Sequence, residues 1–179
     1  MKTISVTLTM ILKKIIEITF GKLFPISYAR WIGVTIGENC RMINVKYSTE
    51  PYLIFIGDHV SATSVHFENH DGGVWCFREQ NPDIDIIKPI RIGNNVYIGF
   101  GAVILPGVTI GDNVVIGACA LVSKDIPSNS VAVGVPARVI KTIDQYIEKA
   151  TSIGDNTKNL TRRLKKEYYK KKYKLYFCD

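Results

Sequence analysis

Residues 92–127 read IGNNVYIGFGAVILPGVTIGDNVVIGACALVSKDIP and repeat with a period of six residues. Aliphatic or small apolar residues recur in two columns that are offset by four positions. The first column is Ile92, Ile98, Ile104, Ile110, Ile116 and Val122, and the second is Val96, Ala102, Val108, Val114, Ala120 and Ile126. An amphipathic helix has a period near 3.6 and a half-buried strand has a period of two, so neither element explains this spacing.

A six-residue repeat predicts an all-β fold, the left-handed parallel β-helix, in which each hexapeptide forms one flat side of a triangular coil. Three hexapeptides complete a coil, so residues 92–109 and 110–127 are expected to form two coils. The apolar columns point into the prism. Gly, Asn and Asp in segments 93–95 and 111–113 suit the corners, where φ can be positive. A series of ordinary short strands would not keep this phase.

The same pattern extends with interruptions toward the N-terminus. Residues 36–40 and 56–60 repeat the Ile-Gly-acidic motif of the main stretch, and the phase is lost at 48–53 and again at about 68–89. A long loop inside a compact repeat is usually functional or disordered. The aromatic residues and glycines of the 68–89 loop favour a functional role.

Three regions follow from these boundaries: an N-terminal helical cap over residues 1–30, the β-helix over 31–140 and a basic helical tail over 141–179. Residues 1–30 mix apolar and basic residues, without the pattern of a signal peptide or a transmembrane span. We expect a helix that covers the open end of the coils. A helix that rests on a membrane surface is the alternative.

The positive charge of the chain is concentrated in its tail. The formal net charge is +7, and residues 155–179 contain nine basic and three acidic residues, so the body is close to neutral. A basic helix over 158–177 is predicted, either solvated or bound to an acidic membrane surface or anionic polymer. Nucleic acid is not expected, because no base-reading motif is present. Four scattered cysteines indicate free thiols in a reducing cytosol.

Three histidines, His59, His66 and His70, are the candidates for proton transfer. His70 lies at the start of the 68–89 loop, and a neutral imidazole can take a proton from a hydroxyl near pH 7. Asp71 is adjacent and is expected to orient the ring. On the residues alone, a single loop histidine is more often structural than catalytic.

Segments 92–99, 104–113, 122–127 and 134–138, together with the His-Asp-Gly-Gly-Val-Trp loop that starts at His70, resemble the hexapeptide-repeat acyltransferases that use acetyl-CoA. This family includes galactoside, maltose and xenobiotic acetyltransferases and bacterial O-acetyltransferases of capsule and lipopolysaccharide. The resemblance covers about residues 28–142. The loop is most similar to the polysaccharide O-acetyltransferase branch.

The resemblance implies an enzyme that moves an acetyl group from acetyl-CoA to a sugar hydroxyl by direct attack, with His70 as general base. The backbone N–H at Phe100 would stabilise the oxyanion. Residues implied for the acetyl-CoA site are Tyr97, Gly99, Phe100, Gly117, Ala118, Ser123, Lys124, Arg138 and Lys141. Residues implied for the acceptor are Asn69, Trp75 and Arg78, since Trp often stacks on sugar rings.

The resemblance also implies a cytoplasmic homotrimer without a metal, acting in capsule or other cell-surface polysaccharide biosynthesis, with contact to the inner face of the membrane as an added option. Two alternatives stay open. One is a zinc enzyme like the γ-type carbonic anhydrases, which share this fold and bind zinc through three histidines. The other is a non-catalytic β-helix scaffold that binds through its basic tail. The acceptor and the length of the acyl group are undetermined.

Overall fold

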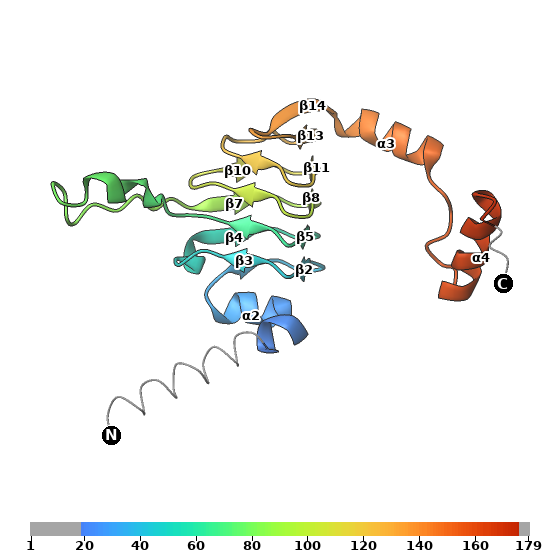
Figure 1. The fold of residues 1–179 in the computed structure, drawn as a ribbon, viewed down its shortest axis with the longest axis horizontal. Helices are drawn as coiled ribbons and strands as arrows, with labels where there is room; N and C mark the ends of the chain where they lie inside the picture. Colours follow the sequence, from blue (N-terminus) through green and yellow to red (C-terminus); the bar gives the residue numbers. More distant parts are fainter. Residues whose placement is uncertain (1–18, 176–179) are drawn as a thin grey trace, which may run out of the picture. The chain divides into compact units, whose positions relative to one another are not determined.

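The structure is a computed structural model that describes residues 19–175, and most of its strands form a parallel β-helix with three sheets (Figure 1). Sheet A contains β1 (Thr35–Ile36), β4 (Ile54–Ile56), β7 (Ile90–Ile92) and β10 (Thr109–Ile110). Sheet B contains β2 (Arg41–Ile43), β5 (Ser61–Thr63), β8 (Val96–Ile98), β11 (Val114–Ile116), β13 (Ser130–Val133) and β14 (Arg138–Thr142). Sheet C contains β3 (Lys46–Tyr47), β6 (His66–Phe67), β9 (Val103–Ile104) and β12 (Leu121–Val122).

The strand register places successive hexapeptide coils directly over one another. Ile92 lies beside Ile110 in sheet A, and Ile104 lies beside Val122 in sheet C, each pair one 18-residue coil apart. Every residue of the two apolar columns is buried. The predicted inward columns and parallel coils are therefore confirmed. The antiparallel strand β14 is the exception, and it pairs with β13 at the C-terminal end of the stack.

Close contact between coils, rather than backbone conformation, explains the glycine at Gly93. The positive φ angles of these corners fall on Asn95 (54°) and Asn113 (56°). A Cβ atom at Gly93 would lie 2.8 Å from the carbonyl carbon of Gly111 and 2.5 Å from Oδ1 of Asp112, in the next coil. Any side chain at this position would therefore push two coils apart.

Replacing Gly93 by alanine is expected to lower the free energy of unfolding by about 1–3 kcal/mol, the usual cost of overpacking a tight site. Urea denaturation followed by circular dichroism measures this loss. Gly72→Ala is the matched control, because no atom lies within 4 Å of a Cβ built on Gly72. Equal destabilisation by the two substitutions would contradict the coil-contact explanation.

A ladder of side-chain hydrogen bonds runs along the corner between sheets A and B. The Asn95 side-chain amide donates to Asn113 Oδ1 at 2.8 Å, and that of Asn113 donates to Asn129 Oδ1 at 2.9 Å. His59 continues the ladder, with Nδ1 2.9 Å from Asn95 Oδ1. His59 is therefore a corner residue of the prism.

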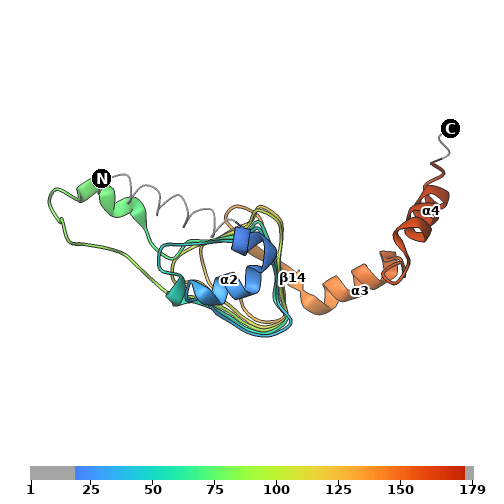
Figure 2. The ribbon, with the colours of Figure 1, turned by 90° about the horizontal axis from the view of Figure 1, so that it is seen from below.

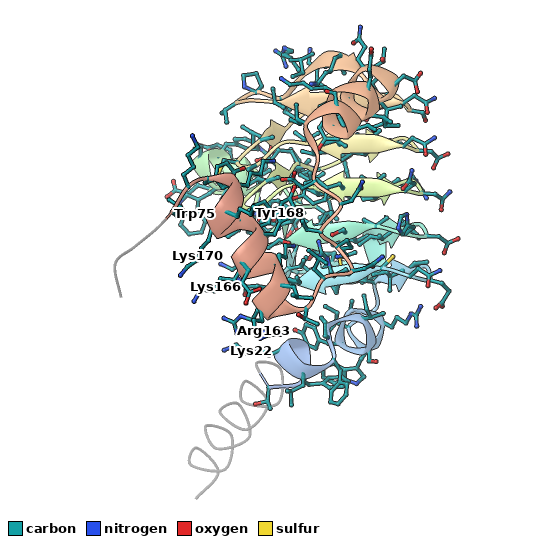
Figure 3. All side chains as sticks on the ribbon, turned by 90° about the vertical axis from the view of Figure 1, so that its right-hand side faces the viewer. Lys22, Trp75, Arg163, Lys166, Tyr168 and Lys170 are labelled. Atoms are coloured by element: carbon teal, nitrogen blue, oxygen red, sulfur yellow. The ribbon has the colours of Figure 1, made fainter. Side chains whose placement is uncertain are left out.

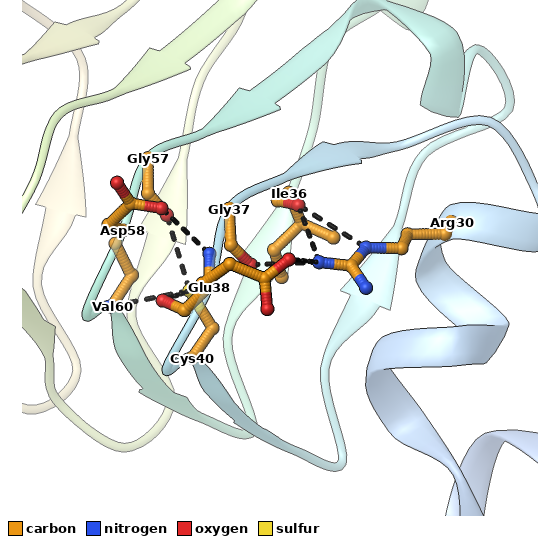
Figure 4. Close-up of polar contacts among 8 residues, drawn as sticks. All are labelled: Arg30, Ile36, Gly37, Glu38, Cys40, Gly57, Asp58 and Val60. Carbon is orange, nitrogen blue, oxygen red and sulfur yellow. Dashed lines mark hydrogen bonds and ion pairs between the residues drawn. The ribbon is translucent and has the colours of Figure 1, made fainter.

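Helix α2 (Pro25–Trp31) lies across the N-terminal end of the coils, as the view in Figure 2 shows. Residues 19–23 are also helical. The α2 residue Ala29 is fully buried in the core, and the Arg30 guanidinium donates to the carbonyl oxygens of Ile36 and Gly37 (Figure 4). An ion pair of 2.7 Å between Arg30 and Glu38 completes this attachment. Residues 1–18 of the expected N-terminal cap lie outside the described residues.

Cys40 lies in the same first coil (Figure 4), where Sγ is 3.2 Å from the carbonyl oxygen of Gly57 and accepts from the Val60 amide at 3.4 Å. Burial raises the pKa of the Cys40 thiol. Cys76 and Cys119 are exposed free thiols. Cys178 lies outside the described residues.

The insertion between β6 and β7 leaves the prism at the corner between sheets C and A and projects away from it, as the green segment of Figure 1 shows. It contains the 3₁₀ helix η2 (Gly72–Phe77), and a bridge between His70 and Ile87 closes its base. The earlier break in the repeat contains the 3₁₀ helix η1 (Pro51–Leu53). Both interruptions therefore occur at the same corner.

The chain divides into two compact units after Tyr146, within helix α3 (Ile143–Ile153). The sequence placed the boundary at residue 140. Strand β14 moves it, because β14 pairs with β13 and so belongs to the β-helix. Among residues 19–175, no helix is both long and apolar enough to span a bilayer.

Helix α4 (Arg162–Lys172) forms the basic part of the second unit. Asp155 accepts from the Tyr168 hydroxyl at 2.8 Å and from Lys172 Nζ at 2.6 Å, and these hydrogen bonds lower the pKa of Asp155. Arg163, Lys166 and Lys170, labelled on this helix in Figure 3, are exposed. The last residues of the expected basic tail, 176–179, are outside the described part of the chain.

Candidate active site

The chain alternates between outward and inward side chains as it leaves sheet C. Phe67 and Asn69 are fully buried, whereas His66, Glu68 and His70 are partly exposed. This is the period of two that an extended strand imposes. The alternation therefore places one carboxylate between two imidazoles on the outer surface.

Glu68 contacts both histidines. Its Oε1 atom is 2.7 Å from His70 Nδ1, and its Oε2 atom is 3.3 Å from His66 Nε2. The Ser48 hydroxyl donates to Glu68 Oε1 at 2.8 Å and lies 2.9 Å from His70 Nδ1. Ser48 comes from the preceding coil, so packing between coils assembles the group.

These contacts determine the tautomer of His70. Because an ionised carboxylate only accepts hydrogen bonds, Nδ1 of His70 carries the proton and donates it toward Glu68. The lone pair of the neutral ring is then on Nε2, which has no hydrogen-bond partner within the described residues. The His70 side chain is 40% exposed, so an incoming hydroxyl can approach the ring.

Asp71 does not orient the ring in this structure, contrary to the sequence expectation. Its Oδ1 atom accepts from the backbone amide of Gly73 at 2.8 Å and caps helix η2. Glu68 makes the contact with His70 instead. The sequence contained a signal for this, because residues two apart on a strand share a face and Glu68 precedes His70 by two.

A cleft of about 300 Å³ opens beside His70, between the loop and the segment before η1. It is lined by Thr49, Glu50, His70, Asp71, Gly72, Val74, Trp75, Arg78, Asp85, Ile86 and Ile87. Trp75 is 79% exposed. The structure therefore brings His70, Asp71, Trp75 and Arg78 to one cleft, whereas Glu50 and Asp85 had no signal in the sequence.

Two residues expected to contact the acceptor have other partners. Asn69 does not line the cleft: it is fully buried, and its side-chain amide donates to the carbonyl oxygen of Glu50 at 2.6 Å. The Arg78 guanidinium donates to the carbonyl oxygens of Pro82 (3.0 Å) and Ile84 (2.6 Å) and pairs with Asp85 at 3.1 Å. Arg78 thus holds the loop in shape.

Four residues implied for acetyl-CoA lie together at the corner between sheets B and C. Gly99 and Phe100 follow β8, and Gly117 and Ala118 follow β11 one coil later. The coils are so close here that a Cβ on Gly99 would lie 2.5 Å from the Ala118 amide nitrogen. The Phe100 amide makes no hydrogen bond in the part of the chain that the structure describes. The coils therefore lie close together at this corner, where the Phe100 N–H is free among the described residues.

The remaining residues implied for acetyl-CoA are distributed over other faces. Tyr97 lies on β8 of sheet B and is 45% exposed. Ser123 and Lys124 follow β12, at the corner between sheets C and A, and are exposed. Arg138 and Lys141 lie on β14, where Lys141 Nζ is 5.4 Å from the centre of the Tyr146 ring.

One chain does not bring together His70 and Phe100, the residues expected to act as general base and oxyanion donor. His70 leaves sheet C at its corner with sheet A, whereas Phe100 lies at the corner between sheets B and C. A whole side of the triangle separates these corners, about 15 Å at roughly 3.3 Å per extended residue. A single protomer therefore carries two half-sites.

The three histidines do not converge either. His59 belongs to the ladder at the corner between sheets A and B, whereas His66 and His70 flank Glu68 at the end of β6. Within residues 19–175, no three His, Cys, Asp or Glu side chains form a group suited to hold a metal ion. The positions of the three histidines in one chain therefore do not support the zinc-enzyme alternative.

Comparison with known proteins supplies the family. The family model described as "Bacterial transferase hexapeptide (six repeats)" matches residues 89–124. Protein CapG of Staphylococcus aureus is 51% identical over 149 residues, which cover 81% of this chain and 87% of CapG. The galactoside O-acetyltransferase of Escherichia coli strain K12 is 41% identical over 131 residues, which cover 67% of this chain and 59% of that protein.

Among solved structures, a galactoside acetyltransferase in complex with coenzyme A is 34% identical and superposes with a TM-score of 0.58. The match covers 75% of this chain and 80% of that chain. The chain therefore belongs to the bacterial hexapeptide-repeat transferase family and folds as the left-handed β-helix of that family.

Proposed function

We propose that this protein is an acetyl-CoA-dependent O-acetyltransferase that acetylates a sugar hydroxyl in capsule or other cell-surface polysaccharide biosynthesis. The observation that carries the proposal is His70, whose Nδ1 contacts Glu68 and whose Nε2 is free beside a cleft. The names of the relatives support it: one is a galactoside O-acetyltransferase, and a solved neighbour binds coenzyme A. CapG, the relative with 51% identity, supports the capsule role.

The chemistry follows from these positions. His70 Nε2 takes the proton of the acceptor hydroxyl as its oxygen attacks the thioester carbonyl of acetyl-CoA. The negative charge that forms on the carbonyl oxygen is stabilised by the Phe100 N–H. Collapse of the tetrahedral intermediate breaks the carbon–sulfur bond, and the departing thiolate takes the proton from the imidazolium. Glu68 stabilises that imidazolium while it exists.

Acetyl-CoA would lie along the corner between sheets B and C. Gly99, Gly117 and Ala118 present no large side chain to the thin pantetheine arm, and exposed Tyr97 is the aromatic surface beside them. The phosphates of the nucleotide require cations, and three of the implied residues supply them. These are Lys124, Arg138 and Lys141, with the Ser123 hydroxyl as a further donor.

The two half-sites of one chain argue for a homotrimer, the assembly expected from the family resemblance. If neighbouring prisms pack side by side, the His70 corner of one protomer faces the Phe100 corner of the next. Each of three equivalent interfaces then contains one complete site. Light scattering would report a mass of about 60 kDa, three times the 20.1 kDa of the chain.

A cytoplasmic protein with peripheral contact to the membrane fits the acceptor class, because polysaccharide precursors are often lipid-linked. Leu23, Phe24 and Trp31 near the N-terminal end of the β-helix are each more than half exposed, and α4 is strongly basic. Aromatic residues and basic clusters are the groups that bind membrane interfaces. Cosedimentation with anionic vesicles, but not with neutral ones, is the expected result.

Free-thiol release from acetyl-CoA, measured with a panel of sugars and capsule fragments, tests the proposed activity. Acceptor-dependent release, with acetylated sugar detected by mass spectrometry, is expected. A titration with coenzyme A on the same samples separates the outcomes. Binding of coenzyme A without release by any acceptor would favour the non-catalytic scaffold, and absence of binding would overturn the proposal.

A further inference from the structure

The cleft beside His70 is lined by more negative than positive charge. Glu50, Asp71 and Asp85 contribute carboxylates, and Arg78 is the single Lys or Arg among the residues that line it. Glu68, on the other side of His70, adds a fourth carboxylate nearby. A ligand in this cleft therefore meets more carboxylate oxygens, which accept hydrogen bonds, than positively charged groups, which donate them.

The one guanidinium in the lining is already engaged. Arg78 donates to the carbonyl oxygens of Pro82 and Ile84 and pairs with Asp85. A carboxylate or phosphate on a ligand would have to displace Asp85 to gain a cation. If Asp85 stays paired with Arg78, the negative group of the ligand faces the carboxylates of the cleft with no cation beside it. Like charges brought together in an interface cost several kcal/mol.

The rest of the lining suits an uncharged sugar ring. Trp75 is 79% exposed at the cleft, and indole rings stack on the apolar faces of sugars. Glu50 is bonded through Oε2 to the Thr49 hydroxyl at 2.6 Å, so its other oxygen remains for a hydroxyl donor. Sugar hydroxyls supply the donors that these carboxylates need.

We infer that the acceptor ring bound beside His70 is an uncharged, hydroxyl-rich sugar, and that sugars carrying a carboxylate or phosphate on that ring are rejected. Glu50 and Asp85 are the residues that set this selectivity. Asp85 acts in two ways, since it adds negative charge and also keeps Arg78 from a ligand anion. The inference rests on the proposed function, because it names the acceptor class of the same site.

The test compares methyl glycosides of glucose, galactose and mannose with the methyl glycosides of the matching uronic acids, which differ only in the C6 carboxylate. With acetyl-CoA saturating, kcat/KM should favour the neutral member of the best pair by at least about 10-fold, corresponding to 1.4 kcal/mol. The preference should shrink in Glu50→Gln and in Asp85→Asn. Glu79→Gln, an exposed loop carboxylate outside the lining, is the matched control and should leave it unchanged.

Ligand-observed NMR with the same glycosides separates this inference from the proposed activity, because it needs no turnover. Saturation transfer to the neutral glycosides, weak transfer to the uronides and loss of transfer in Trp75→Ala are expected even if no acetyl transfer occurs. Equal or stronger binding of the uronides would overturn the inference. So would absence of binding by every glycoside, or a charge preference that Glu50→Gln and Asp85→Asn leave intact.

Discussion

His70→Ala is expected to lower kcat for acetyl transfer by at least about 100-fold, the scale of a lost general base. Water replaces the imidazole poorly, because the ring is held in place by Glu68, 2.7 Å from Nδ1, at the lining of the cleft. Affinity for coenzyme A should be unchanged, since the residues proposed to bind it at the corner between sheets B and C do not include His70. Thiol release and a coenzyme A titration measure the two quantities.

The matched control is His66→Ala. His66 contacts the same carboxylate, but its Nε2 is the atom that lies 3.3 Å from Glu68, and it does not line the cleft. Its loss should cost much less than that of His70. If His66→Ala and His70→Ala reduce kcat equally, the pair acts through structure and the general-base role of His70 is wrong.

Glu68→Gln should have the second largest effect, a decrease in kcat of about 10- to 100-fold. The substitution keeps the shape of the side chain and removes its charge. Hydrogen bonds to charged groups are worth about 1.5–3 kcal/mol, and this stabilisation of the imidazolium is realised as the proton moves to His70. Glu68 is a positioning residue, so KM for acetyl-CoA should be unchanged while kcat falls.

Asp71→Asn distinguishes the two carboxylates that flank His70. Asp71 caps η2 through Gly73, and an asparagine at an N-cap keeps that hydrogen bond. Its kcat should therefore stay close to that of the parent protein. The reverse ranking, with Asp71→Asn as the more damaging substitution, would return the orienting role to Asp71.

The residues expected at the site divide according to whether their position depends on the repeat. Gly99, Phe100, Gly117 and Ala118 fall at one corner because a six-residue period assigns every residue of a coil to a side or a corner. The loop residues carry no such assignment. The carboxylate that contacts His70 was therefore misidentified: adjacency suggested Asp71, whereas strand alternation places Glu68 on the face of the imidazole.

Contacts between residues of separate coils could not be predicted from the sequence. Ser48 reaches His70 across 22 positions, and the cleft is lined both by Glu50, from the earlier break in the repeat, and by Asp85, from the insertion. Such contacts depend on how the loop folds back, which follows from the Arg78 hydrogen bonds and the bridge between His70 and Ile87. Nothing local in the sequence encodes them.

The sequence by itself determined the β-helix, its apolar columns and the point where the chain leaves it, because a strict period leaves one way to bury those columns. The tertiary structure decided which atoms meet at His70: which carboxylate orients the ring, which guanidinium is already paired, and which corners lie apart. Those contacts depend on how the coils pack and on how a loop without a repeat folds back. They join residues that are far apart in the sequence, so they form only when the chain is folded.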